Sequence, residues 1–81
     1  VAIALPALLR AEKLQKRAAR TGFDWPDPSG SEAKIAEEIE ELKAATSDAA
    51  RLEEAGDLLF AAVNVVRAHG IAAEDALRAA N

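Results

Sequence analysis

Apolar residues recur at helical spacing in the first part of the chain. Between Ala7 and Arg20 they follow one another every three or four residues, which is the period of an amphipathic helix. The stripe consists of Leu8, Ala11, Leu14 (or Gln15) and Ala18. The basic residues of this segment lie mostly away from the stripe. The pattern therefore predicts a first helix over Ala7–Arg20.

The next segment, Thr21–Gly30, interrupts this pattern. It contains two prolines and two glycines, a composition that predicts a loop. Ser29, followed three residues later by Glu32, is typical of a capping box at the start of a helix. Ser31 is the alternative N-cap. We expect a second helix from about Ser31 to Ala45.

A third helix follows the short sequence TSD, which ends the second. Either Ser47 or Asp48 can cap it. We expect the helix to run from about residue 49 to Ala68 or His69. Gly70 supports this end, because glycine is the usual residue just beyond a helix C-terminus.

A last helix is expected from near Ala72 or Ala73. Glu74 and Asp75 then lie in its first turn, where negative charge suits the helix dipole. The chain shows no strand pattern. The predicted class is all-α, an antiparallel helical bundle, because the links between the helices are short.

Acidic residues in the second helix lie beside its apolar positions. At about 100° per residue, Ile35, Ile39 and Leu42 form the expected buried stripe, and Glu38 lies on its shoulder. Glu40 faces the opposite side, toward water. The residues that share the side of Glu38 are Lys34, Glu37 and Glu41. The pattern predicts one acidic patch joined by a lysine.

The third helix also aligns acids with apolar residues. Glu54, Asp57, Ala61 and Asn64 fall on one side. Leu58 and Val65 flank them, and a second apolar face consists of Leu59, Ala62, Val63 and Val66. A helix that is apolar on two faces is surrounded by others, so we expect Glu54 and Asp57 to be partly buried.

Acids that converge from two helices repel one another unless a cation or a proton intervenes. Lys34 alone cannot neutralise them. An all-oxygen cluster suits a hard divalent ion, Mg²⁺ or Mn²⁺. The alternative interpretation is a solvated helix face, in which acids pair with bases three or four residues away.

Composition limits the other possibilities. The chain has 81 residues, enough for one small domain, and no cysteine, which fits a cytoplasmic location. A net charge of −4 gives no general argument for a nucleic-acid partner, and no apolar stretch is long enough to suggest a membrane partner. The small, alanine-rich core predicts a homodimer. The first residue is not Met and the helical pattern still runs at Asn81, so we expect a piece that continues further.

Two ordered motifs resemble those of the MazG family of all-α nucleoside triphosphate pyrophosphohydrolases. They are Glu37-Glu38-x-x-Glu41 and Glu54-x-x-Asp57. The flanking sequences LQKRAARTGFDWPD and GDLLFAAVNVVRAHGIAAEDALRAAN are also similar to MazG sequences, so the resemblance covers Leu14 to Asn81. It implies a four-helix core completed by dimerisation. It also implies Mg²⁺-dependent cleavage of a nucleoside triphosphate to monophosphate and pyrophosphate, in the house-cleaning of nucleotide pools.

The resemblance implies roles for individual residues. The Mg²⁺ ligands are expected to be Glu38, Glu41, Glu54 and Asp57. Glu37 and Glu53 are expected as supporting acids, one of which orients or deprotonates the attacking water. In similar proteins the last helix continues past Asn81 with basic residues that reach the substrate phosphates.

Other positions keep two interpretations each. Lys34 could contact a phosphate or only pair with Glu38, and Asn64 could contact ribose or base or be a satisfied core amide. Phe23 and Trp25 could stack on a base or close the end of the bundle. Arg67 is expected as a surface or helix-end charge and His69 as a helix cap. The alternative function for the whole chain is a non-catalytic dimerisation module.

Overall fold

Helices are the only regular elements in the described residues, 6–22 and 28–81, of this computed structural model. This confirms the all-α class. In chain order they are α1 (Ala7–Arg20), α2 (Pro28–Ala44), α3 (Asp48–Ala68) and α4 (Ala73–Ala80). None of these helices combines the length and the apolar character that a membrane span requires.

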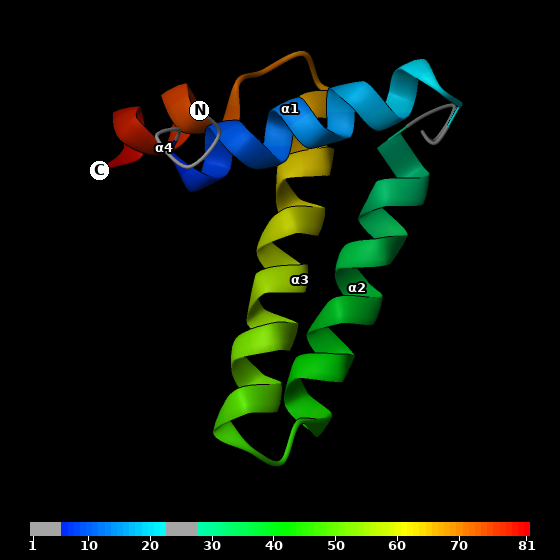
Figure 1. Cartoon of the computed structure of the whole chain (residues 1–81), viewed down its shortest axis with the longest axis vertical. Coiled ribbons are helices and arrows are strands. Elements are labelled where there is room, and N and C mark those ends of the chain that lie inside the picture. The colour runs from blue at the N-terminus through cyan, green and yellow to red at the C-terminus, as the bar shows by residue number, and fades with distance from the viewer. Residues whose placement is uncertain (1–5, 23–27) are drawn as a thin grey trace.

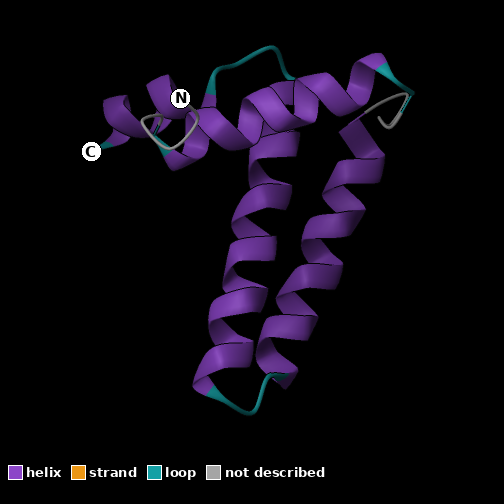
Figure 2. Cartoon of the chain, in the orientation of Figure 1, coloured by secondary structure: helices purple, strands orange, loops and turns teal. Residues whose placement is uncertain are grey.

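The helices are arranged as a hairpin with a crossing pair at one end (Figures 1 and 2). Helices α2 and α3 run antiparallel, side by side, joined by a short turn. Helix α1 crosses the end of the hairpin where α2 begins and α3 finishes, and α4 lies beside α1. The antiparallel arrangement is confirmed for α2 and α3. One chain does not close a four-helix bundle, and completion by a second chain stays a prediction.

Local sequence sets both ends of α3, as expected. The Ser47 hydroxyl accepts a hydrogen bond from the backbone N–H of Ala50 at 3.0 Å. At the other end Gly70 adopts φ +76°, and its N–H donates to the carbonyl of Arg67 at 2.9 Å. The N–H of Ile71 donates to the carbonyl of Val66 at 3.3 Å, which completes a Schellman motif. This turn directs the chain back toward α1.

The predicted start of α2 was wrong. The helix begins at Pro28 instead of Ser31, so Ser29 and Ser31 lie within it and neither is its N-cap. Proline suits a first helical turn, because its ring fixes φ near the helical value and its missing N–H has no intrahelical acceptor there. The sequence contains too few local cues to distinguish this start from a cap three residues later.

The predicted buried face of α1 was also wrong in part. Leu14 is 47% exposed, whereas Glu12 and Gln15 are only 6% and 4% exposed. The Gln15 side-chain amide donates to the backbone carbonyl of Phe60 at 2.8 Å. Helix α1 is therefore attached to α3 by a buried hydrogen bond in addition to apolar contact, and the buried face is turned toward these polar residues.

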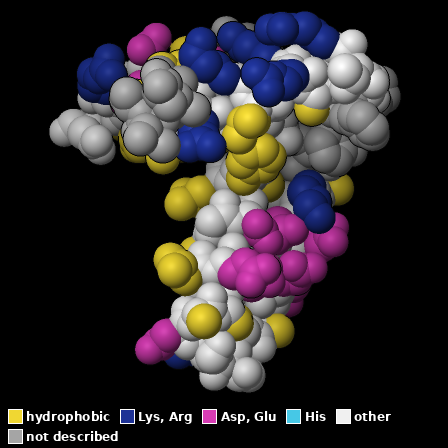
Figure 3. Space-filling view, viewed as in Figure 1, with side chains coloured by type: hydrophobic (Ala, Val, Ile, Leu, Met, Phe, Trp, Pro, Cys, Tyr) yellow, Lys and Arg dark blue, Asp and Glu magenta, His cyan; other side chains and the backbone are white. Residues whose placement is uncertain are grey.

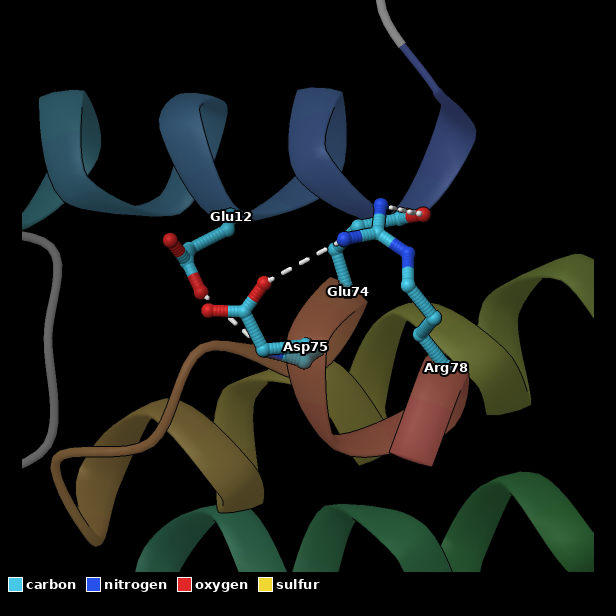
Figure 4. Close-up of polar contacts among 5 residues, drawn as sticks. Glu12, Glu74, Asp75 and Arg78 are labelled. Atoms are coloured by element: carbon cyan, nitrogen blue, oxygen red, sulfur yellow. Dashed lines mark hydrogen bonds and ion pairs between the residues drawn. The ribbon is translucent and has the colours of Figure 1, made fainter. Parts of the chain in front are cut away.

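Glu12 joins α1 to α4 (Figure 4). Its Oε1 accepts a hydrogen bond from the backbone N–H of Ala73, the first residue of α4, at 3.2 Å. The N-cap residue of α4 is Ala72, which has no side chain that can cap. Glu12 therefore supplies both an acceptor and a negative charge at the positive end of the α4 dipole. Its other oxygen lies 3.4 Å from Lys16 Nζ.

The apolar core of the described part of the chain is small. Its buried apolar residues are Ala61, Val63 and Ala73, and four polar residues are equally buried. Ile39, predicted to be buried, is 41% exposed, because α2 turns Glu38 rather than Ile39 toward α3. Leu52 and Leu59, two turns apart on one face of α3, are 77% and 61% exposed.

Replacing Glu12 by Ala should lower the free energy of unfolding by about 1–2 kcal/mol, because α4 loses its only N-terminal acceptor seen in the described residues. Urea denaturation followed by circular dichroism measures this. Glu32→Ala is the control, since Glu32 is an exposed glutamate on α2, away from the α1–α4 contact. Equal stability of the two variants would contradict the capping role.

Replacing Leu59 by Glu should convert the predicted homodimer to a monomer, because the charge falls in the exposed apolar face of α3. Light scattering at micromolar concentration gives the mass. Leu77→Glu changes a leucine of comparable exposure, 48%, on α4 and should leave the dimer intact. A monomeric unmodified protein would contradict the predicted assembly.

Candidate metal and nucleotide site

Five carboxylates gather on one face of the α2–α3 hairpin (Figure 3). They form two groups that share Glu38: one with Glu37 and Glu41, the other with Glu54 and Asp57. Within each group, one oxygen from every residue lies within 4.8 Å of the others. All four predicted metal ligands and the supporting acid Glu37 are thus brought together.

The sequence places these acids by simple helical spacing. Glu38 and Glu41 are three residues apart on α2, as are Glu54 and Asp57 on α3, so each pair lies on one side of its helix. The antiparallel hairpin then sets the middle of α2 against the first half of α3. Glu38 is the residue at which the two sides meet.

Glu38 is the most unusual of the five. It is 3% exposed, and its Oε1 lies 3.1 Å from Lys34 Nζ. Its Oε2 is buried and has no hydrogen-bond donor among the described residues, and the same holds for Glu54 Oε2. A buried carboxylate oxygen without a partner costs free energy of unfolding. A bound cation would give both oxygens the partner that the described protein atoms do not provide.

The charges of the site reinforce this conclusion. The pKa of Glu54 is raised because its carboxyl group shares a hydrogen bond with Glu41, is partly removed from water, and is repelled by Glu41, Asp57 and Glu38. The pKa of Lys34 is raised by its hydrogen bond to Glu38 and by the charge of Glu37. A second cation would relieve the repulsion among the acids, as protonation of Glu54 does.

The donor set fits a hard divalent cation. Every candidate ligand is a carboxylate oxygen, and two of these oxygens are buried without a partner among the described residues. Mg²⁺ and Mn²⁺ prefer such oxygens, whereas zinc sites usually include histidine or cysteine. The residues that would hold the ion are Glu38, Glu41, Glu54 and Asp57.

A pocket of about 320 Å³ opens beside the carboxylates. Its lining residues are Lys34, Glu38, Asp57, Phe60, Ala61 and Asn64. Its lining combines charged groups with an aromatic side chain and an amide, that of Asn64, which lies about two turns beyond Asp57 on α3. The Asn64 carbonyl oxygen accepts a hydrogen bond from Arg67 Nη2 at 2.9 Å.

Several sequence expectations have different outcomes here. Lys34 pairs with Glu38 and also lines the pocket, and its contact with a phosphate stays a prediction. Glu40 faces outward and pairs with Lys43 at 3.2 Å, as expected. Asp57 is exposed rather than partly buried, because within one chain only α2 covers this face of α3. Glu53 belongs to neither carboxylate group.

Two further expectations concern pocket residues. Trp25 and Phe23 lie outside the described residues, and their roles stay predictions. Phe60 was missed by the sequence reasoning, although it lies three residues after Asp57 and four before Asn64, a spacing that puts it near both. Arg67, expected as a surface or helix-end charge, lies in the last turn of α3, as the second alternative predicted, and is half-buried against Asn64 rather than fully at the surface.

Comparison with known proteins agrees with this geometry. A family model described as phosphoribosyl-ATP pyrophosphohydrolase matches residues 9–81. The chain belongs to this family.

Similar proteins confirm the relationship to MazG. The chain is 51% identical to a nucleoside triphosphate pyrophosphohydrolase of Escherichia coli (strain K12) over 82 aligned residues, which cover 95% of this chain. It is 47% identical to a nucleoside triphosphate pyrophosphohydrolase/pyrophosphatase MazG of Thermotoga maritima over 76 residues, 94% of this chain. The chain spans 31% and 30% of the lengths of these relatives.

The raised pKa of Glu54 predicts that the metal-free domain loses stability as pH rises. The folded state keeps the Glu54 proton at a pH where the unfolded chain has lost it. The unfolding free energy therefore falls between the ordinary glutamate pKa and the raised pKa of Glu54. Glu54→Gln should remove this pH dependence. Urea denaturation in a chelator at several pH values measures it.

The matched control is Glu40→Gln, which changes an exposed glutamate paired with Lys43 on the outer face of α2. It should keep the pH dependence of the unmodified domain. Loss of the dependence in Glu40→Gln, or its persistence in Glu54→Gln, would show that the acids of the site do not cause it.

Proposed function

We propose that the chain is a Mg²⁺-dependent pyrophosphohydrolase domain that cleaves nucleoside triphosphates between the α and β phosphates. The products are a nucleoside monophosphate and pyrophosphate, and the role is removal of unwanted nucleotides from the cellular pool. The observation that carries the proposal lies within a cluster of five carboxylates: one buried oxygen each of Glu38 and Glu54 has no hydrogen-bond partner in the part of the chain that the structure describes.

The cluster is better suited to a cation-bound polyphosphate than to a structural role. A structural acid cluster would be expected to pair with bases, yet among the described residues Lys34 pairs with only two of the five acids, Glu37 and Glu38. When bound, Mg²⁺ neutralises phosphate charge and lowers the pKa of a water molecule. The carboxylates alone would repel a triphosphate, whereas the cation that they hold would attract it.

The side chains around the cluster have complementary roles. Lys34 Nζ lies at the edge of the pocket and can exchange its contacts with Glu37 and Glu38 for a phosphate oxygen. Glu37 is exposed beside Glu38 and Glu41, where its carboxylate can orient the attacking water and accept its proton. Phe60 and Asn64 line the far end of the pocket and can receive the nucleoside.

Two observations favour this function over the alternative of a non-catalytic module. The four proposed metal ligands and Glu37 lie close together in the described structure, and similar proteins are named as nucleoside triphosphate pyrophosphohydrolases. The family description adds phosphoribosyl-ATP as a candidate substrate. Ordinary triphosphates and phosphoribosyl-ATP present the same α–β linkage, so both belong in the test.

Pyrophosphate release from ribo- and deoxyribonucleoside triphosphates and phosphoribosyl-ATP, with and without Mg²⁺, tests the proposal. Glu38→Gln and Glu54→Gln should each lower kcat/KM by about 100-fold or more, since each removes a charge that holds the cation. Glu40→Gln, on the outer face, should retain nearly full activity. Circular dichroism confirms that each variant is folded.

Two results would contradict the proposal. Absence of metal-dependent pyrophosphate release from every substrate would favour the non-catalytic module. Equal damage from Glu40→Gln and Glu38→Gln would show that the carboxylates of the α2–α3 face are not the active centre.

A further inference from the structure

Arg67 contacts the one amide of the nucleotide pocket. It lies three residues after Asn64 on α3, and its Nη2 donates a hydrogen bond to Asn64 Oδ1 at 2.9 Å. Both side chains are half-buried. Arg67 also lines a second pocket, of about 210 Å³, between α1 and the turn that leads to α4.

This contact fixes which way the Asn64 amide faces. A guanidinium group has only donors, so the amide atom that faces it must be the oxygen. The Asn64 side chain makes no other hydrogen bond within the described residues. The Nδ2 group, with two N–H donors, is therefore the polar part of Asn64 that remains for the pocket.

Asn64 lies at the nucleoside end of that pocket. It follows Asp57 by seven residues, or about 10 Å along α3, on the same side of the helix. If the phosphates lie against the carboxylates, as the proposed function requires, the base and sugar fall near Phe60 and Asn64. The polarity of Asn64 then decides which nucleoside group can pair there.

We infer that Arg67 is a positioning residue that holds Asn64 as a hydrogen-bond donor, so that the pocket selects nucleotides presenting an acceptor at that point. The acceptor is a carbonyl oxygen or ring nitrogen of the base, or an oxygen of the sugar. This inference rests on the proposed function and adds a determinant of substrate choice to it. Without Arg67 the amide is free to rotate and present either its donors or its acceptor.

Calorimetric titration with Mg²⁺ and α,β-methylene analogues of ATP, GTP, CTP and UTP, and of their 2′-deoxy forms, tests the inference. These analogues cannot be cleaved at the α–β linkage. Arg67→Met should weaken binding of the preferred nucleotide about tenfold and reduce the differences in affinity between the nucleotides. Arg67→Lys keeps a donor and should retain most of the preference.

Arg51→Met is the matched control. Arg51 is on the same helix and also donates to the residue three positions earlier, Asp48, at 2.7 Å, but it is exposed and outside the pocket. It should bind like the unmodified protein. If Arg67→Met reduces the differences in affinity among analogues with different bases, the acceptor is on the base. If it reduces the difference in affinity between ribose and deoxyribose analogues, the acceptor is a sugar oxygen. Unchanged affinity and preference overturn the inference.

A double-mutant cycle separates positioning from a general structural effect. Asn64→Leu removes the amide, so adding Arg67→Met should then cause no further loss of affinity. A full additional loss would show that Arg67 acts by another route. If Arg67→Met does not fold, the side-chain amide NMR signals of Asn64 in the unmodified protein decide the question. They should shift on analogue binding, and constant signals overturn the inference.

The failure of the proposed function gives a distinct result. If the unmodified protein binds none of the analogues in the presence of Mg²⁺, the pyrophosphohydrolase proposal falls and the inference falls with it. If the unmodified protein binds and discriminates while Arg67→Met behaves identically, only the inference is wrong.

Discussion

The repulsion among carboxylates at the α2–α3 interface is the constraint on which the site depends. Glu38 is buried against α3 with one oxygen paired to Lys34 and the other unpartnered among the described residues. Glu54, opposite it, avoids part of the repulsion by holding its proton more tightly. A hairpin of two ordinary amphipathic helices would place aliphatic residues here. The cost of these acids is understandable if a divalent cation and an anionic substrate complete the interface.

The rest of the chain supports this hairpin at one end. Helix α1 crosses that end and is attached by Gln15 to the Phe60 carbonyl and by Glu12 to the start of α4. The Gln15 bond falls on the turn of α3 that contributes Phe60 and Ala61 to the pocket. These polar bonds connect the supporting helices to the part of the pocket lined by Phe60 and Ala61, whereas the carboxylates of the described residues come from α2 and α3.

The helices could be predicted from sequence where the information is local. The bounds of α1, the Ser47 cap and the Gly70 turn depend on neighbouring residues only, and they were correct. The buried face of α1 could not be derived in this way, because Glu12 and Gln15 are buried by partners 61 and 45 residues away. Periodicity favoured Leu14 since it compares residue types without knowing what faces them.

The carboxylate cluster was predictable for a similar reason. Spacings of three residues on two successive helices define its members, and the hairpin brings them together. The pocket beside the cluster was harder to predict from the sequence. The contribution of Phe60, and the direction in which Arg67 turns the Asn64 amide, depend on side-chain positions that no spacing rule provides.

The central claim is that the carboxylates around Glu38 form a divalent-cation site, and location of the ion tests it most directly. Crystals of the protein grown with Mn²⁺ would reveal the metal by its anomalous scattering. The account predicts a peak between α2 and α3, within coordination distance of the Glu38 and Glu54 oxygens that lack partners. A fully occupied Mn²⁺ elsewhere, with these two oxygens still unligated, would contradict it.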